Sequence, residues 1–141
     1  MSSPRTILQN DYSQGSAKTE VTIAIVNPSN LRQITYVKRI KIDTGFNGGF
    51  YIRESEMSQL DIIGVKPRVG GTTLADNRRV TSHNCFGYLQ KIGNYQLPSP
   101  GIEISIVFQG TSPEGLLGLE AISNWIVTFD GPAESFKIDS P

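Results

Sequence analysis

Short runs in which apolar and polar residues alternate recur along most of the chain and limit what it can fold into. Val21, Ile23 and Ile25 alternate with polar or small neighbours, and residues 102–108 (IEISIVF) repeat the pattern. Alternation with a period of two predicts strands with one buried face. Glycine and proline often interrupt these runs, and many short strands with such turns favour a sandwich or a barrel. We therefore expect an all-β protein.

The expected strands pair mostly in hairpins. The run from Thr19 and the run at residues 32–42 flank the turn-forming sequence NPSN and predict a first hairpin. A second, longer hairpin is expected within residues 70–89, with Asp76 and Asn77 at its polar tip because these residue types tolerate turn conformations. Residues 125–129 and 134–138 predict two closing strands.

Only short helices are expected. In residues 53–64 (RESEMSQLDIIG), Met57 and Leu60 fall on one helical face and Gly64 can end the helix. Residues 115–125 (GLLGLEAISNW) suggest an apolar strand followed by a brief helical turn. One or two short helices should therefore accompany the sheet.

Length and composition point to one domain with a polar leading segment. The 141 residues suit a single domain, since domains typically have about 100 to 150 residues. Residues 1–18 carry little apolar surface, so we expect a flexible arm followed by a domain at 19–141. Thirteen basic residues balance thirteen acidic ones, which argues against a nucleic-acid or anionic-membrane partner. A peptide or a small neutral substrate fits better.

The numbers of cysteine and histidine residues indicate the cellular compartment and the absence of a zinc site. One cysteine, Cys85, cannot form an internal disulfide, and with one histidine, His83, it cannot supply a zinc site of soft ligands. The start of the chain shows neither a signal peptide nor a membrane span, which needs roughly 18 apolar residues. We expect a cytoplasmic protein that needs no metal or cofactor.

The glycine-rich turn in residues 41–52 (KIDTGFNGGFYI) holds the candidate site. Asp43, Asn47, Gly48 and Glu54 occupy positions 1, 5, 6 and 12 of an EF-hand-like calcium loop. Gly45 at position 3 has no side-chain oxygen, and a strand replaces the incoming helix that the motif requires. The turn therefore matches the calcium-binding motif only in part.

Three other interpretations of the turn remain open on these residues alone. A glycine-rich turn can bind a phosphate through its backbone N–H groups, although the P-loop and dinucleotide motifs are absent here. Asp43 can instead cap its own backbone, as Asx residues in turns commonly do. It can also present a catalytic carboxylate.

The sequence Asp43-Thr44-Gly45, delivered by the apolar strand IKI, resembles the active-site loop of the retroviral-type aspartic proteases, the retropepsins. More narrowly, DTGFNG followed by a helix, then LADN and LLGLEAISNWIVTFD, resembles a prokaryotic group of small retropepsin-like proteins. The similarity spans about residues 19–138. Its specificity lies in the combination of the DTG sequence with the later apolar-apolar-Gly element.

This resemblance implies a closed β-barrel-like retropepsin (acid protease) fold and a homodimer in which each subunit supplies one Asp43. Two carboxylates a few Å apart hold one proton between them, an arrangement for which the aspartic proteases are the reference example. The implied activity is an aspartic endopeptidase that acts on peptides without a cofactor or metal. The alternative is a non-catalytic retropepsin-like binding or assembly module with a vestigial dyad.

The resemblance also implies roles for residues around Asp43. Thr44 would hydrogen-bond across the dimer, Gly45 would allow close backbone approach, and Phe46 would narrow the adjacent pocket because retroviral enzymes have a small residue there. Two further groups follow from the family pattern: a substrate-binding flap tip and an element beneath the turn. The flap tip comprises Leu74, Ala75, Asp76 and Asn77, and the supporting element comprises Leu116, Leu117 and Gly118.

Overall fold

Strands make up most of the protein, as the alternating apolar runs predicted. The computed structural model describes residues 5–11 and 16–140. The strands are β1 (Arg5–Asp11), β2 (Lys18–Val26), β3 (Gln33–Ile42), β4 (Phe50–Ile52), β5 (Arg68–Thr73), β6 (Arg79–Ile92), β7 (Tyr95–Gln96), β8 (Ile102–Phe108), β9 (Gly115–Leu117), β10 (Ile126–Asp130) and β11 (Ser135–Ser140). The helical segments are the 3-10 helix η1 (Glu54–Gln59) and the α-helices α1 (Leu60–Ile63) and α2 (Leu119–Ile122).

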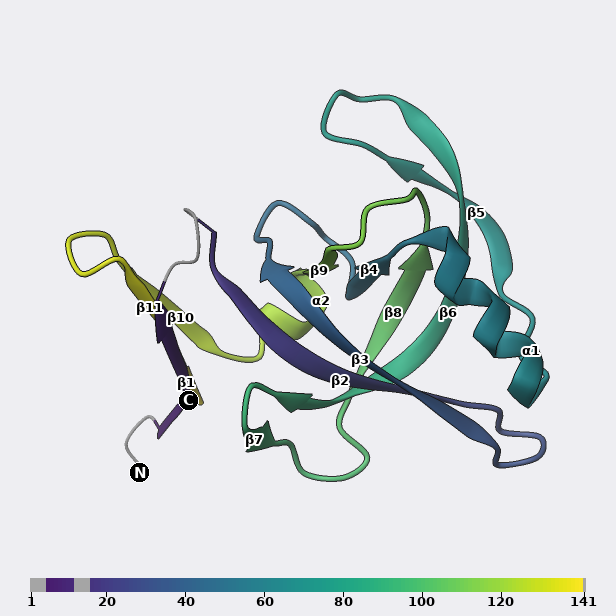
Figure 1. The fold of residues 1–141 in the computed structure, drawn as a ribbon, viewed down its shortest axis with the longest axis horizontal. Helices are drawn as coiled ribbons and strands as arrows, with labels where there is room; N and C mark the ends of the chain where they lie inside the picture. The colour runs from purple at the N-terminus through teal and green to yellow at the C-terminus, as the bar shows by residue number, and fades with distance from the viewer. Residues whose placement is uncertain (1–4, 12–15, 141) are drawn as a thin grey trace.

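Six strands close into a barrel. They follow the order β2-β3-β9-β4-β8-β6, and β6 pairs again with β2 to complete the circuit. The pairs β3–β9 and β4–β8 are parallel, whereas the pair β4–β9 is antiparallel. The hairpin of β5 and the first half of β6 projects above the barrel, on the side of the turn between β3 and β4 (Figure 1). The expected closed-barrel fold with short helices is confirmed.

The barrel interior is filled by the apolar faces of its strands. Alternation puts one face of each strand inside, where the side chains lose contact with water and pack against one another. Tyr36 and Phe108 meet there edge to face, with ring centroids 6.4 Å apart. The largest fully buried side chains are Phe50, Phe108, Phe136, Ile23, Ile25, Ile40, Leu60, Ile63, Leu89, Ile92, Ile104 and Ile106.

The predicted hairpins and the first helix also form. Strands β2 and β3 pair from Lys18 opposite Lys41 to Val26 opposite Gln33. The helix expected at residues 53–64 is a 3-10 turn that continues into a short α-helix and ends at Gly64, whose φ is +73°. Among the described residues, no helix is long and apolar enough to cross a bilayer.

A separate three-stranded sheet corrects the expectation of a flexible arm at residues 1–18. Strand β1 pairs with β11, from Arg5 opposite Ser140 to Asp11 opposite Ser135, and β10 lies on the other side of β11 (Figure 1). Ile7 and Leu8 are buried, so a short apolar pair and a distant partner strand order a segment that is mostly polar. The expectation is wrong for residues 5–11 and 16–18, since Ala17 is buried and Lys18 begins β2. Residues 1–4 and 12–15 lie outside the described residues.

Candidate active site

The Asp43 turn links β3 to β4, and these two strands are not adjacent in the sheet. Strand β3 ends at Ile42, β4 begins at Phe50, and β9 lies between these two strands in the sheet. The N–H of Asp43 donates to the carbonyl oxygen of Leu117 at 2.9 Å, and the N–H of Phe46 donates to the carbonyl oxygen of Asp43 at 3.2 Å. The backbone of Asp43 is therefore held at both ends.

The Asp43 carboxyl group uses one oxygen locally. The N–H of Gly45 donates to its Oδ1 at 2.9 Å, so Asp43 does cap its own turn. In the part of the chain that the structure describes, Oδ2 has no hydrogen-bond partner. The side chain is half-buried, whereas Thr44 and Gly45 are exposed. Local capping thus orients the carboxyl group and leaves its second oxygen available.

The predicted supporting element lies directly beneath the turn. The N–H of Gly118 donates to the carbonyl oxygen of Gly49 at 2.8 Å, and the N–H of Leu119 donates to the carbonyl oxygen of Phe46 at 2.9 Å. A Cβ at position 118 would stand 2.4 Å from the carbonyl oxygen of Gly48 and 2.5 Å from that of Phe46. Only glycine permits this approach, since real Cβ atoms keep at least about 3 Å from such atoms.

A cavity of about 340 Å³ opens between the turn and the projecting hairpin. It is lined by Asp43, Gly45, Phe46, Tyr51, Thr73, Leu74, Ala75 and Leu116. The hairpin therefore reaches over the carboxyl group, and apolar groups dominate the wall around it. Such a concave, largely apolar space with one convergent carboxylate is typical of small-molecule or peptide sites.

Two aromatic residues shape one wall of this cavity. The rings of Phe46 and Tyr51 meet edge to face, with centroids 6.1 Å apart and planes at 83°. The hydroxyl of Tyr51 donates to Oε1 of Gln109. Burial raises the pKa of Tyr51 above its ordinary value, so this phenol stays neutral at physiological pH. Phe46 is thus held against the cavity rather than pointing away from it.

The predicted site residues occupy four places in the structure. Asp43, Gly45, Phe46, Leu116, Leu74 and Ala75 meet at the cavity. Leu117 and Gly118 are buried beneath the turn, and Thr44 lies exposed at its edge. Asp76 and Asn77 are exposed at the hairpin tip and do not line the cavity. These positions are observations, and the roles of the residues remain predictions.

The tip residues shape the hairpin turn. Asp76 Oδ2 accepts a hydrogen bond from the Arg78 side chain at 2.7 Å, with both side chains exposed. Asn77 has φ of +67°, the left-handed conformation that favours Gly or Asn. The N–H of Asn77 donates to the carbonyl oxygen of Leu74 at 2.9 Å. Asn77 can therefore hold the left-handed position at the tip of this hairpin.

Sequence reasoning missed three residues at or beside the cavity, namely Tyr51, Thr73 and Gln109. Tyr51 pairs with Leu116 of β9 and Val107 of β8, so its position depends on strands more than fifty residues away. No local pattern reveals such pairing. The alternation of Phe50, Tyr51 and Ile52 gives one weak signal, because it places Tyr51 on the face opposite the two buried residues.

His83, Glu54 and Cys85 show no sign of a metal site or a nucleophile in the structure that is described. His83 Nδ1 lies 3.8 Å from Oε1 of Glu54, the residue that a calcium loop would need as a ligand. Among the described residues, no three acidic, His or Cys side chains come together as a metal site. Burial raises the pKa of the Cys85 thiol to about 12, which makes it a poor nucleophile.

One comparison with known proteins found a match. The fold is similar to that in the crystal structure of a retropepsin-like aspartic protease from Rickettsia conorii, with a TM-score of 0.59 and 15% sequence identity. The match covers 99% of this chain and 97% of the other. No protein-family model and no curated protein sequence matches the chain. The barrel is thus the retropepsin-like fold, while the identity is too low to transfer function by itself.

Proposed function

We propose that the chain is one subunit of a homodimeric aspartic endopeptidase, within the prokaryotic group that its DTGFNG sequence resembles. The observation that carries this proposal is the half-buried Asp43 carboxyl group. Its Oδ1 accepts a hydrogen bond from the N–H of Gly45, and its Oδ2 has no hydrogen-bond partner among the described residues. It lies in a cavity beneath the tip of a projecting hairpin. The retropepsin-like fold supports the same conclusion.

Two copies of Asp43 would share one catalytic proton. Carboxylates a few Å apart cannot both ionise cheaply, so one is charged and the other protonated. The charged carboxylate takes a proton from a water molecule between them, and that water attacks the peptide carbonyl carbon. The protonated carboxyl group donates its proton to the carbonyl oxygen, which gives a neutral tetrahedral intermediate. The carboxyl group that took the water proton then donates it to the amide nitrogen, the C–N bond breaks, and the other carboxylate takes a proton from a hydroxyl of the intermediate, which restores the shared proton.

In the proposed dimer, exposed residues of the turn would contact the second subunit. Thr44, Gly45 and Asn47 are exposed, so the turn reaches the surface of the single chain. Thr44 makes no side-chain hydrogen bond within the described part of the protein, which leaves its hydroxyl available to Thr44 of the partner subunit. We assign Thr44 the task of holding the two turns in register.

The hairpin formed by β5 and β6 would act as the flap. Leu74 and Ala75 face the cavity and would cover a bound peptide, excluding water from the reacting groups. Phe46 and Leu116 would contact the side chains beside the scissile bond. Because Phe46 narrows the pocket, small or flat apolar side chains should fit there better than branched bulky ones.

Substitution of the carboxyl group tests the proposal directly. Parent protein and Asp43→Asn are incubated at pH 4 to 6 with a library of proteome-derived peptides, and cleavage is read by mass spectrometry. Asp61→Asn is the matched control, because Asp61 is exposed on α1. We expect Asp43→Asn to lose about 10³-fold or more in cleavage rate, and Asp61→Asn to match the parent. Equal cleavage by Asp43→Asn and parent would overturn the proposal.

The same experiment separates the alternative of a non-catalytic binding or assembly module. A module would form dimers yet give no cleavage that depends on Asp43. The proposed enzyme should lose specific activity on dilution, because a dissociated subunit carries only half of the catalytic pair. We also keep a reducing, cytoplasmic location as a proposal, which the single thiol of Cys85 supports.

A further inference from the structure

A second hollow, outside the catalytic cavity, lies around an exposed aromatic residue of β6. Phe86 is 66% exposed and borders a cavity of about 480 Å³ that also includes Asn84 and Ser105. A neighbouring cavity of about 520 Å³ shares Phe86 in its lining. Phe86 thus presents its ring at the border of two adjoining hollows.

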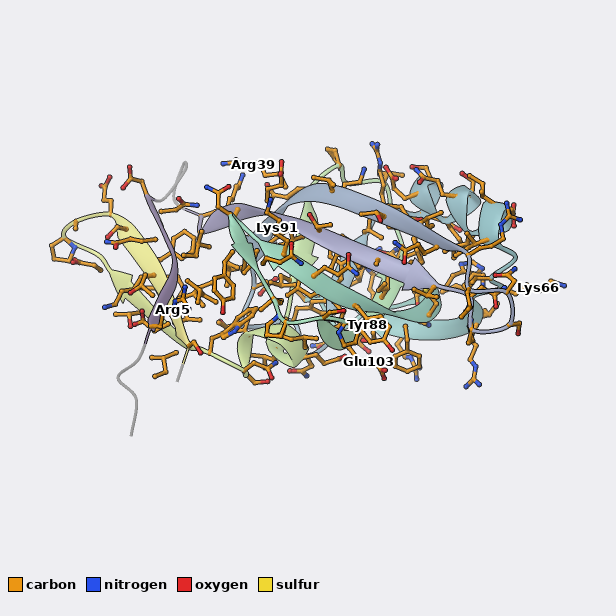
Figure 2. The ribbon with its side chains drawn as sticks, turned by 90° about the horizontal axis from the view of Figure 1, so that it is seen from below. Arg5, Arg39, Lys66, Tyr88, Lys91 and Glu103 are labelled. Atoms are coloured by element: carbon orange, nitrogen blue, oxygen red, sulfur yellow. The ribbon has the colours of Figure 1, made fainter. Side chains whose placement is uncertain are left out.

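Two cations, Lys66 and Arg68, border the first hollow without a partner. Both side chains are exposed, and neither makes an ion pair with any described residue. Figure 2 shows Lys66 extending away from the protein, at the end opposite to the three-stranded sheet. The cations are therefore available to carboxylates of another molecule.

Two acidic side chains border this part of the surface: Glu120 contacts the lining residue Ser105, and Glu103 lines the neighbouring cavity. Glu120 accepts from the N–H of Ser105 at 2.8 Å and from its hydroxyl at 2.6 Å. Glu103 accepts from the Tyr88 hydroxyl at 3.4 Å, and these two side chains lie together in Figure 2. The hollow thus has a basic side at Lys66 and Arg68, and none of its lining residues is acidic.

Strand register places this hollow and the catalytic cavity on the same face of the sheet, with the buried side chain of Val107 between them. Paired residues in neighbouring strands point to the same face of a sheet. One such row crosses five strands through Leu116, Tyr51, Val107, Asn84 and Arg68. Leu116 and Tyr51 line the catalytic cavity, whereas Asn84 and Arg68 line the hollow. Leu116 and Arg68, at the two ends of the row, are separated by four strand spacings of about 4.8 Å each, which add up to about 19 Å.

We propose that this hollow binds an acidic segment of the substrate at a distance from the scissile bond. An extended peptide rises about 3.3 Å per residue, so about six residues reach from the catalytic cavity to Arg68. Lys66 and Arg68 would pair with Asp or Glu side chains, Asn84 would hydrogen-bond the peptide backbone, and Phe86 would contact an adjacent apolar side chain. The inference rests on the proposed function and names the substrate class of that site as acidic, extended peptides.

Cleavage-site profiling provides the first test. The double variant Lys66→Glu/Arg68→Glu is compared with the parent and with Arg39→Glu, a reversal of an exposed cation on β3. We expect parent cleavage sites to be enriched in Asp and Glu about five to seven residues from the scissile bond on one side. The double variant should lose this enrichment while still cleaving, and Arg39→Glu should keep it. Asp43-dependent cleavage without the enrichment would overturn this inference and leave the proposed function standing.

Direct binding provides a second test that needs no catalysis. In an Asp43→Asn background, fluorescence anisotropy is measured with a twelve-residue probe of alternating Glu and Leu that carries a neutral dye. Lys66→Glu/Arg68→Glu should weaken binding about fivefold or more, and Arg39→Glu should not. Equal binding in all variants would overturn the proposal. Loss of dimerisation in the double variant, with probe binding unchanged, would also overturn it and assign this surface to a second copy of the chain.

Discussion

At the residue scale, burial and hydrogen bonding distinguish side chains that support the fold from Asp43, the proposed catalytic residue. Glu56 is 8% exposed and receives hydrogen bonds from Lys38 at 2.6 Å and Arg53 at 3.2 Å. Cys85 is partly buried and packs against the barrel core. Asp43, by contrast, keeps one oxygen without a described partner and faces a cavity. Each of these environments has a measurable consequence.

Cys85 should react slowly with thiol reagents in the folded protein. Burial raises the pKa of its thiol to about 12, so very little thiolate is present at pH 8. We expect labelling by a disulfide reagent to be about a hundredfold or more slower than in urea-unfolded protein, whose thiol has a pKa of about 8.5. A folded-state rate close to the unfolded rate would show that Cys85 is accessible and ionised.

Glu56→Gln should destabilise the barrel in a pH-dependent way. Burial by itself would raise the pKa of Glu56, but hydrogen bonds and charges from Lys38 and Arg53 outweigh it and hold the pKa below its ordinary value of 4.5. A lowered pKa gives the parent stability that is complete above about pH 4.5 and is lost as pH falls through the folded-state value. The variant should be about 1 to 2 kcal/mol less stable at pH 7.

Urea unfolding at pH 7 and at pH 3 measures this difference. The gap in the free energy of unfolding between Glu56→Gln and the parent should be smaller at pH 3 than at pH 7, because below about pH 4.5 the parent loses part of this contribution. Glu20→Gln is the control, because Glu20 is exposed and makes no ion pair among the described residues. A gap of the same size at both pH values would contradict the assignment.

At the element scale, period-two patterns and turn residues predicted the local structure well, and long-range pairing was beyond their reach. The hairpin of β2 and β3, the hairpin of β5 and β6 and the strand β8 lie where alternation placed them. The strand β1 was missed, because its order depends on pairing with β11 at the other end of the chain. Tyr51 was missed for the same reason, since strands distant in sequence place it beside Phe46.

The contact between β9, α2 and the Asp43 turn predicts a steric effect at Gly118. Its φ of −106° is accessible to any residue, so a substitution acts through space and not through backbone strain. Gly118→Ala would place a Cβ within 2.5 Å of two carbonyl oxygens, those of Gly48 and Phe46. We expect a loss of about 3 kcal/mol, or a fall in Tm of about 10 °C.

Gly131→Ala is the matched control for this experiment. An added Cβ at Gly131 meets nothing within 4 Å. Thermal unfolding followed by circular dichroism should therefore give a Tm close to that of the parent for Gly131→Ala and a clearly lower one for Gly118→Ala. Equal Tm values for the two variants would show that the turn can move away from Gly118 without cost.

At the scale of the whole molecule, the Asp43 turn lies at the surface of the barrel. The hairpin of β5 and β6 covers this turn from one side (Figure 1). Thr44 and Asn47 are exposed beside Asp43, and the described chain supplies no second carboxylate to the cavity. A shared-proton mechanism needs two carboxyl groups, so the proposed activity belongs to a pair of chains. The three-stranded sheet, which joins both ends of the chain, lies to one side of the barrel (Figure 1).

The separation of the two Asp43 carboxyl groups in a crystal structure of the protein tests this account most directly. We predict a two-fold dimer in which carboxyl oxygens from the two subunits lie about 3 Å apart, with a water molecule hydrogen-bonded to both. The Thr44 hydroxyls should lie beneath them, within hydrogen-bonding reach of the facing turn. A protein that crystallises and sediments as a monomer, or as a dimer whose Asp43 carboxyl groups face away from each other, would contradict the account.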